Sequence, residues 1–456
     1  MHNGGVSFWW QQVGIPAARP ALDGPESADV CIVGAGYTGL WTAYYLKTLK
    51  PDWTVVVLER RFAGFGASGR NGGWLTNSVT GGRGQFVAQH GRAAAEAQQR
   101  AMNETVDEVI RVAAAEGIDA DIVAGGELNV AFTPAQMARM QGFAREEQSW
   151  ESTDLAVLTA AQVSERIRFT GALGGTWHPH CARIHPAKLV AGLAAAVERL
   201  GVVIYENSGV TEIRPGIVET DHGSVAAGAI VRATEGFTAD LPAEHRTWLP
   251  MNSSIIVTEP LSDAIWESIG WEGREVYGDY AHVYMYAQRT ADNRIAFGGR
   301  GVPYRFGSRT DNDGTTAAAT VRHLTDLLHR MLPQTSAARV EHAWSGVLGV
   351  PRDWAATVCF DPATRIGWAG GYVGTGVATT NLAGRTLADL ICGRDTDITR
   401  LPWVGHVAQQ WEPEPLRWVG VRGMYAAYSL ADRIENRGRP RTSIIARLAD
   451  TISGMH

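Results

Sequence analysis

Hydrophobic positions fall into short continuous runs that alternate with longer segments of helical spacing. Residues 28–33 form an apolar, β-prone run, and apolar positions at helical spacing follow through Leu46. A second apolar run covers residues 54–59. This pattern predicts a strand, a glycine turn, a helix and a second strand in succession. The same order of strand, glycine loop and helix returns at residues 366–393.

Further periodic segments lie between these two motifs. Helical spacing predicts helices over residues 92–117 and 187–200, the second followed by an apolar strand. Three β-prone runs between residues 253 and 301 indicate strands of another domain. A chain of 456 residues is too long for one ordinary core, so we expect two domains.

The first turn carries the spacing GxGxxG at Gly34, Gly36 and Gly39. In this context the first glycine permits a tight turn, the second lets the backbone approach a pyrophosphate, and the third allows the helix to pack on the strand. Glu59 ends the second strand, where its carboxylate can accept hydrogen bonds from both ribose hydroxyls. The motif predicts a dinucleotide site, with NAD and FAD both open.

A glycine-rich loop, GFGASGRNGGWL at residues 64–75, follows this acid directly. Ser68, Arg70 and Asn71 could face phosphate, and the amides of Gly72 and Gly73 could face a ring edge. The late glycine loop, Gly370 to Gly376, could complement the negative charge of a reduced flavin. NAD needs neither loop, so the pair favours FAD.

Composition narrows the range of partners. The net charge of −6 argues against a nucleic-acid surface. The four cysteines form no CxxC pair, so neither a metal site nor a disulfide framework is predicted. No run of about 18 apolar residues indicates a membrane span, and we expect a cytoplasmic protein. The oligomeric state stays open.

These segments together resemble the D-amino-acid oxidase superfamily of FAD-dependent oxidoreductases, in its glycine, sarcosine and γ-glutamylputrescine oxidase-like branch. The resemblance is carried by DVCIVGAGYTGL (29–40), VVVLERRFAGFGASGRNGGWL (55–75) and residues 181–213, 230–238, 294–301 and 370–393. It implies a doubly wound, Rossmann-like α/β domain for FAD and an α+β substrate domain with a large mixed or antiparallel sheet. The expected boundaries are residues 25–90, 151–243 and 340–396 for the FAD domain, 91–150 and 244–339 for the substrate domain, and 397–456 for a tail packed on the body.

The resemblance also implies a set of FAD contacts. The residues carried over by motif are Gly34, Gly36, Gly39, Glu59, Ser68, Arg70, Asn71, Gly72, Gly73, Val210, Ala233, Thr234, Gly374, Thr375 and Gly376. Relatives that bind FAD covalently use a cysteine shortly before the late glycine motif. Cys359 falls too late for that role, so we expect non-covalent FAD.

The implied chemistry is oxidation of a C–N bond. Hydride passes from the carbon next to nitrogen to flavin N5, and water hydrolyses the resulting imine. Because the amine must be uncharged, we expect an apolar, aromatic pocket. The candidates for its wall are Trp74, Tyr284, Tyr286 and Trp344, and His178 could steer a proton or a substrate carboxylate. Arg289 and Arg300 are alternatives for holding a substrate carboxylate.

The predicted function is therefore an FAD-dependent amine or amino-acid oxidoreductase, with O2 as the expected acceptor and H2O2 as its product. The chain holds three lysines, and none corresponds to the lysine that activates oxygen in some relatives. Two alternatives stay open. One is a dehydrogenase of an amine or hydroxy acid that uses another electron acceptor, and the other is a flavin-binding subunit without its own turnover.

Overall fold

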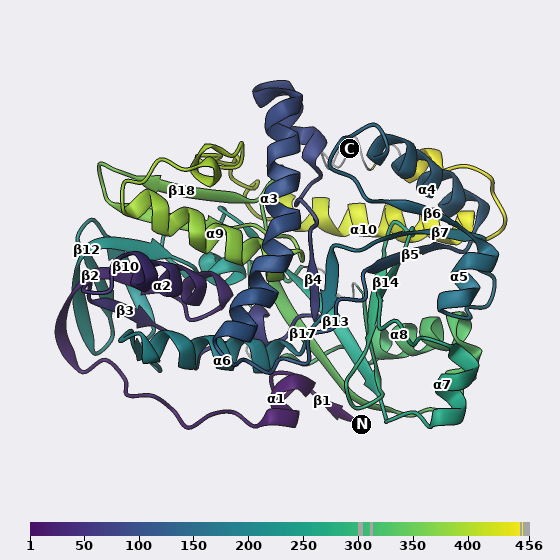
Figure 1. The fold of residues 1–456 in the computed structure, drawn as a ribbon, viewed down its shortest axis with the longest axis horizontal. Coiled ribbons are helices and arrows are strands. Elements are labelled where there is room, and N and C mark those ends of the chain that lie inside the picture. The colour runs from purple at the N-terminus through teal and green to yellow at the C-terminus, as the bar shows by residue number, and fades with distance from the viewer. Residues whose placement is uncertain (300–303, 311–312, 447–448, 450–456) are drawn as a thin grey trace.

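The computed structural model describes residues 1–299, 304–310, 313–446 and 449. Two large β-sheets lie side by side, with the long helix α3 (Val87–Ala115) upright at the centre of the view and helix α10 (Leu416–Glu435) along the right-hand half (Figure 1). The pairing of an α/β sheet that has a parallel centre with a second, large mixed sheet confirms the predicted fold class.

The first sheet has a parallel centre. Its order is β10-β11-β12-β2-β3-β9, and β19 joins β12 while β18 joins β19. Strands β9, β3, β2, β12 and β19 run parallel, and β10, β11 and β18 are antiparallel additions. The bounds are β2 Gly24–Val33, β3 Val55–Leu58, β9 Val203–Tyr205, β10 Val210–Arg214, β11 Ile217–Thr220, β12 Gly223–Arg232, β18 Thr357–Asp361 and β19 Ile366–Gly370.

Alternate residues of the central strands face two different layers. Val30, Ile32 and Val57 share a core with helices α2 (Tyr37–Leu49), α6 (Pro186–Arg199) and α9 (Gly376–Ile391). The intervening residues, such as Cys31 and Val56, pack on the other face with side chains of β10, β11 and β12. This period of two is that of strands buried on both faces.

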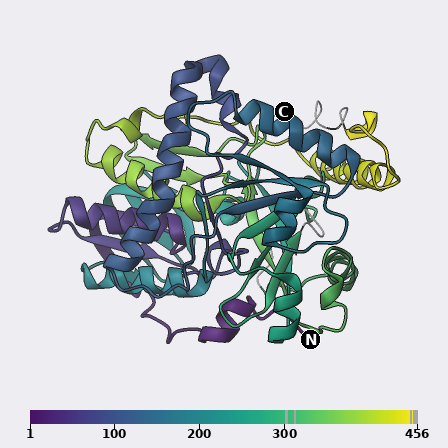
Figure 2. The ribbon, with the colours of Figure 1, turned by 45° about the vertical axis from the view of Figure 1, so that its right-hand side comes forward.

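The second sheet has nine strands in the order β1-β17-β13-β16-β15-β14-β5-β7-β6. Its strands are β1 His2–Asn3, β5 Glu127–Ala131, β6 Ala156–Thr159, β7 Gly174–His178, β13 Leu249–Thr258, β14 Val276–Asp279, β15 Met285–Arg289, β16 Ile295–Gly299 and β17 Val340–Val350. The helices of this half are α4 Pro134–Glu147, α5 Ala160–Arg166, α7 Asp263–Ile269 and α8 Ala318–Met331. Figure 2 shows them around this sheet. A short pair, β4 (Trp74–Thr76) with β8 (Cys181–Arg183), lies apart from both sheets.

Several segments lie with a different sheet or core from the one that the expected domain boundaries give them. Strand β17 pairs with β13, β7 pairs with β5 and β6 pairs with β7, so residues 340–350, 174–178 and 156–159 lie in the nine-stranded sheet. Helix α3 contributes Val106 and Val109 to the core of the first sheet. A strand's partner is set by long-range pairing, which local periodicity does not reveal.

The N-terminal arm packs into the body of the protein. Helix α1 (Phe8–Val13) buries Phe8, Trp9 and Trp10. His185 caps α6 by accepting a hydrogen bond from the Lys188 amide, and its other ring nitrogen lies 3.2 Å from Gln12 Oε1. His342 contacts Gln11 and the Gly4 carbonyl. Burial lowers the pKa of both histidines to about 4, so both are neutral at pH 7.

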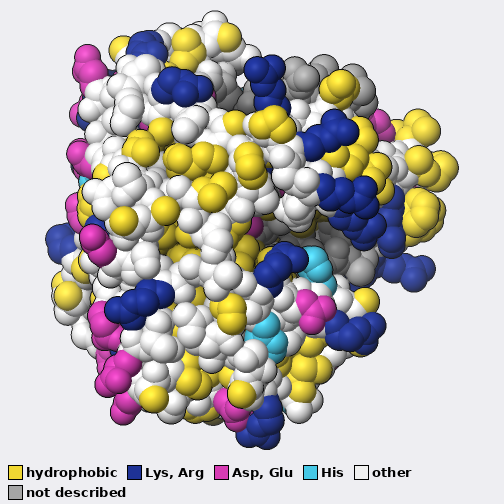
Figure 3. Space-filling model, turned by 90° about the vertical axis from the view of Figure 1, so that its right-hand side faces the viewer, with side chains coloured by type: hydrophobic (Ala, Val, Ile, Leu, Met, Phe, Trp, Pro, Cys, Tyr) yellow, Lys and Arg dark blue, Asp and Glu magenta, His cyan; other side chains and the backbone are white. Residues whose placement is uncertain are grey.

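The C-terminal helix packs on its own chain, along the nine-stranded sheet. Asp432 on α10 accepts hydrogen bonds from the amides of His282 and Val283. In the view of Figure 3, basic and apolar side chains gather at the upper right of the molecule. Among the described helices, none combines the length and the apolar character that a membrane crossing requires.

The two buried histidines predict a loss of stability in acid. Their pKa is lower in the folded state than the ordinary 6.5, so the unfolded chain binds more protons as pH falls from 6.5 toward 4. Preferential protonation of the unfolded chain at each histidine should lower the free energy of unfolding by about 2 kcal/mol between pH 7 and pH 5. Asparagine can also cap a helix, so His185→Asn should abolish about half of this pH dependence. Urea unfolding at both pH values measures it, and an unchanged dependence would contradict the assignment.

Candidate cofactor and substrate site

A first cavity opens at the carboxyl ends of the parallel strands. It is bordered by Gly34 after β2, Glu59 after β3 and Ala233 after β12. Ligands of open α/β sheets bind at this edge. The predicted cofactor residues that line it are Gly34, Gly36, Glu59, Ser68, Asn71, Val210, Ala233, Thr234, Gly374 and Gly376.

The glycines of the first turn have separate structural causes. Gly34 has a φ of +106°, and a Cβ there would lie 2.6 Å from the Ala233 carbonyl oxygen. A Cβ on Gly39 would collide with the Gly34 carbonyl and approach Ile32, so this glycine permits the helix to pack on the strand. Gly36 is the N-cap of α2 and offers no side chain to the first-turn amides.

The two helix N-termini at this cavity suit an anion. Neither Gly36 on α2 nor Thr375 on α9 supplies a capping side-chain hydrogen bond. The Thr375 hydroxyl donates to the Tyr372 carbonyl instead. The Tyr37 amide at the start of α2 donates to Ser68 Oγ at 2.8 Å. The positive dipole ends of the two helices fit the pyrophosphate of a dinucleotide.

Glu59 lies at the predicted position for a ribose contact. Its carboxylate accepts hydrogen bonds from the Ala35 amide at 2.9 Å and the Arg61 amide at 3.0 Å. Burial raises its pKa above the ordinary value, against the lowering effect of these two amides. The carboxylate is therefore fixed at the cavity wall, where its remaining lone pairs can accept hydrogen bonds from hydroxyl groups.

The glycine-rich loop is held from behind by the N-terminal arm. Ser7 Oγ donates to the Gly69 carbonyl at 2.7 Å, and Trp9 Nε1 donates to the Asn71 carbonyl at 2.8 Å. Trp10 Nε1 lies 3.3 Å from the Gly64 carbonyl. A Cβ on Gly69 would collide with Trp10 and with the Gly64 carbonyl. Packing against protein, rather than against a ligand, thus requires this glycine.

The side chains of the following loop residues lie in different surroundings. Arg70 is fully buried, and its guanidinium donates to the Phe65 carbonyl at 2.8 Å and lies 3.5 Å from the Ser345 carbonyl. The Gly73 amide donates to Asn71 Oδ1. A Cβ on Gly72 would lie 2.6 Å from the Tyr286 ring. Ser68 and Asn71 are the polar side chains of this loop that line the first cavity.

A second cavity adjoins the first. Ala67, Asn71, Leu348, Gly374 and Val377 border both. Three of the predicted substrate residues, Trp74, Tyr284 and Tyr286, line the second cavity, together with Gly72 and Thr375. The Tyr286 hydroxyl lies 2.8 Å from Ser253 Oγ. These three aromatic side chains come from β4, β15 and the loop before β15.

The remaining predicted substrate residues lie elsewhere. Trp344 is in the core between Phe8 and Trp9, and its indole donates to the Arg70 carbonyl at 2.8 Å. His178 stands behind the cavity wall, 3.5 Å from Glu127. Arg289 is buried against Trp266 and pairs with Glu272. Arg300 falls outside the described residues.

Besides the exposed Asp240, two acidic residues at the cavities escaped the sequence analysis. Glu235 lines the first cavity, and burial raises its pKa to about 7. Glu127 lines the second cavity. Both stand at the edges of strands or short helices, and no local motif distinguishes them from ordinary surface acids.

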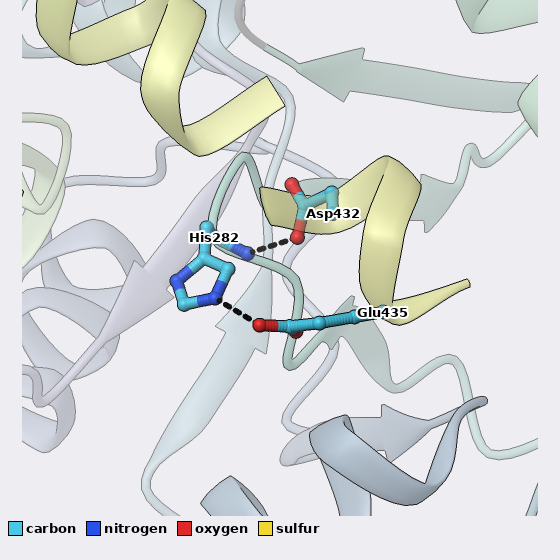
Figure 4. Close-up of side chains that lie close together, drawn as sticks. All are labelled: His282, Asp432 and Glu435. Atoms are coloured by element: carbon cyan, nitrogen blue, oxygen red, sulfur yellow. Dashed lines mark hydrogen bonds and ion pairs between the residues drawn. The ribbon is translucent and has the colours of Figure 1, made fainter. Parts of the chain in front are cut away.

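His282, Asp432 and Glu435 form a separate ionisable cluster (Figure 4). Their potential ligand atoms lie within 4.8 Å of one another. Asp432 accepts two backbone amides, and Glu435 accepts from Arg139 at 2.6 Å. Because a cation already occupies one carboxylate, we interpret this cluster as the contact that fastens α10 to the nine-stranded sheet.

Comparisons with known proteins agree with this geometry. The family model described as FAD dependent oxidoreductase matches residues 29–390. The γ-glutamylputrescine oxidoreductase of Escherichia coli (strain K12) is 32% identical over 427 residues, which cover 90% of this chain and 93% of that protein.

Solved structures show the same fold. The crystal structure of glycine oxidase from Geobacillus kaustophilus superposes with a TM-score of 0.69 at 21% identity, covering 84% of this chain and 100% of that one. L-proline dehydrogenase from P. horikoshii superposes with a TM-score of 0.68 at 18% identity, covering 83% and 96%.

The contact between arm and loop predicts different responses at two nearby glycines. Gly69→Ala should lower the free energy of unfolding by about 3 kcal/mol, because Trp10 and the backbone leave no room for the methyl group. At Gly66, a Cβ would meet only the Phe237 ring, at 3.4 Å. The matched control Gly66→Ala should therefore cost less than about 0.5 kcal/mol. Urea unfolding of the cofactor-free variants compares them, and equal losses would refute the explanation.

Proposed function

The chain belongs to the family of FAD-dependent oxidoreductases, and from this premise we propose that it oxidises the C–N bond of a primary or secondary amine or amino acid. The observation that carries the proposal is the junction of the two cavities. Asn71 and Gly374 border both, so a cofactor held in the first cavity can reach a substrate in the second.

The residues of the first cavity fit FAD. The N-termini of α2 and α9 suit its pyrophosphate, and Glu59 suits its adenosine ribose. Val210, Ala233 and Thr234 would complete the adenosine side of this site. Gly374, Thr375 and Gly376 would approach the ring system, where the dipole of α9 favours negative charge.

Bound FAD would supply the hydride acceptor of the reaction. The protein's share is to bind and orient the amine and to exclude water. The rings of Trp74, Tyr284 and Tyr286 form an apolar wall, which lowers the cost of holding the reacting nitrogen uncharged. Ser253 orients the Tyr286 ring through its hydroxyl.

We propose that FAD binds without a covalent link. All four cysteines are among the described residues, and none borders either cavity. Cys359 lies in β18, where its thiol is 3.2 Å from the Thr357 hydroxyl. Denaturation should therefore release all of the flavin into the supernatant.

Oxygen is the proposed electron acceptor, giving H2O2. The alternative is a dehydrogenase, and one observation favours it: the described lysines Lys47, Lys50 and Lys188 border neither cavity. A flavin-binding subunit without its own turnover is disfavoured by the second cavity, which has room and aromatic walls for a small molecule.

Anaerobic reduction of the flavin tests the proposed function. Primary amines, N-methyl amines and amino acids are added separately to the purified yellow protein, with hydroxy acids as the control. We expect at least one amine class, and no hydroxy acid, to bleach the flavin. Readmission of air then separates the acceptors: rapid return of colour supports an oxidase, and return only with an artificial acceptor supports a dehydrogenase. A yellow protein that no amine bleaches contradicts the proposal.

A further inference from the structure

Glu127 is a buried carboxylate on the wall of the second cavity. It is the first residue of β5, between β14 and β7, and its exposed fraction is 8%. Among the described residues that line this cavity, Arg70 and Glu127 carry the two charged side chains. A buried charge in such a place is costly unless neighbours compensate for it.

Three neighbours hold the Glu127 carboxylate. The Thr76 hydroxyl donates to Oε2 at 2.7 Å, and Asn129 Nδ2 donates to Oε1 at 2.8 Å. His178 Nε2 lies 3.5 Å from Oε2. A carboxylate offers about four lone-pair positions, so acceptor capacity remains after these contacts.

The neighbours keep Glu127 ionised. Burial alone would raise its pKa, but His178, Thr76 and Asn129 together bring the pKa below the ordinary value. The Arg70 guanidinium, the other charge on this wall, is held at the Phe65 carbonyl and approaches the Ser345 carbonyl. Glu127 therefore presents an ionised carboxylate beside aromatic rings, with the His178 imidazole 3.5 Å from Oε2.

This charge does not suit the reacting nitrogen. Oxidation requires an uncharged amine, and an adjacent carboxylate would favour its protonated form. Nor does it suit proton abstraction, since a carboxylate with a lowered pKa is a weak base. It does suit a cationic group elsewhere on the same substrate, since a charge-assisted hydrogen bond in a sheltered site is strong.

We propose that Glu127 forms a subsite for a second, cationic nitrogen of the substrate, so that the cavity selects diamine-type molecules over simple monoamines. The proposal rests on the proposed amine oxidation for its reaction, and on the Glu127 geometry for its selectivity. Thr76 and Asn129 are positioning residues that aim the carboxylate at the bound cation.

Calorimetric titration of the holoenzyme under anaerobic conditions tests this subsite without relying on turnover. Diaminobutane and n-butylamine are the probes, because they differ in one ammonium group. Wild type should bind the diamine about tenfold to a hundredfold more tightly. Glu127→Gln keeps the shape and removes the charge, so it should abolish most of this preference.

Glu96→Gln is the matched control. Glu96 is also buried, at 5% exposure, and also accepts several hydrogen bonds, but it lies on α3 and borders neither cavity. This variant should keep the preference for the diamine. A preference that survives in Glu127→Gln would overturn the subsite.

The comparison of diamine and monoamine binding by the wild type tests the proposal even if Glu127→Gln does not fold. Equal binding of diamine and monoamine by wild type would overturn the proposal by itself. Selective diamine binding without bleaching of the flavin would support the subsite and count against the proposed oxidation, so the two failures are distinguishable.

Discussion

The site depends on the contact between the N-terminal arm and the glycine-rich loop. Glycine-rich backbone has little conformational preference of its own, so its shape must be imposed from outside. Ser7, Trp9 and Trp10 impose it by donating to loop carbonyls from the buried side. The opposite side of the loop is thereby left to form the border between the two cavities.

The same loop joins the two sheets. Trp344 on β17 donates to the Arg70 carbonyl, and Tyr286 on β15 packs over Gly72. Arg70 extends from the loop toward the Ser345 carbonyl, also on β17. A displacement of the loop would therefore move the aromatic wall relative to the nucleotide-binding edge. Because the loop lies between the two sheets, many residues near the site are packed against other protein groups.

Local motifs allowed the first cavity to be predicted. Much of the second could not be predicted, because its residues come together through long-range strand pairing. Gly34, Gly36 and Glu59 lie within one strand–turn–helix–strand unit, so their spacing alone brings them together. Glu127 reaches its place through pairing of β5 with β7 and β14, which periodicity does not encode. Trp344 is of a residue type that is common in pockets, but its place on β17 buries the side chain in the core. The glycines at 64 and 69 indicated close approach correctly, although the approaching side chains are Val190 at Gly64 and Trp10 at Gly69.

The two cavities differ in the polar groups that line them. The first presents the N-termini of α2 and α9 beside the carboxylates of Glu59 and Glu235, and the second presents the Glu127 carboxylate beside Arg70. Electrostatic interactions strengthen as water is excluded, so the helix ends favour a pyrophosphate and Glu127 favours a cation. Because the two cavities share a border, we propose that they hold a dinucleotide and the cationic end of a diamine-type substrate in a fixed order.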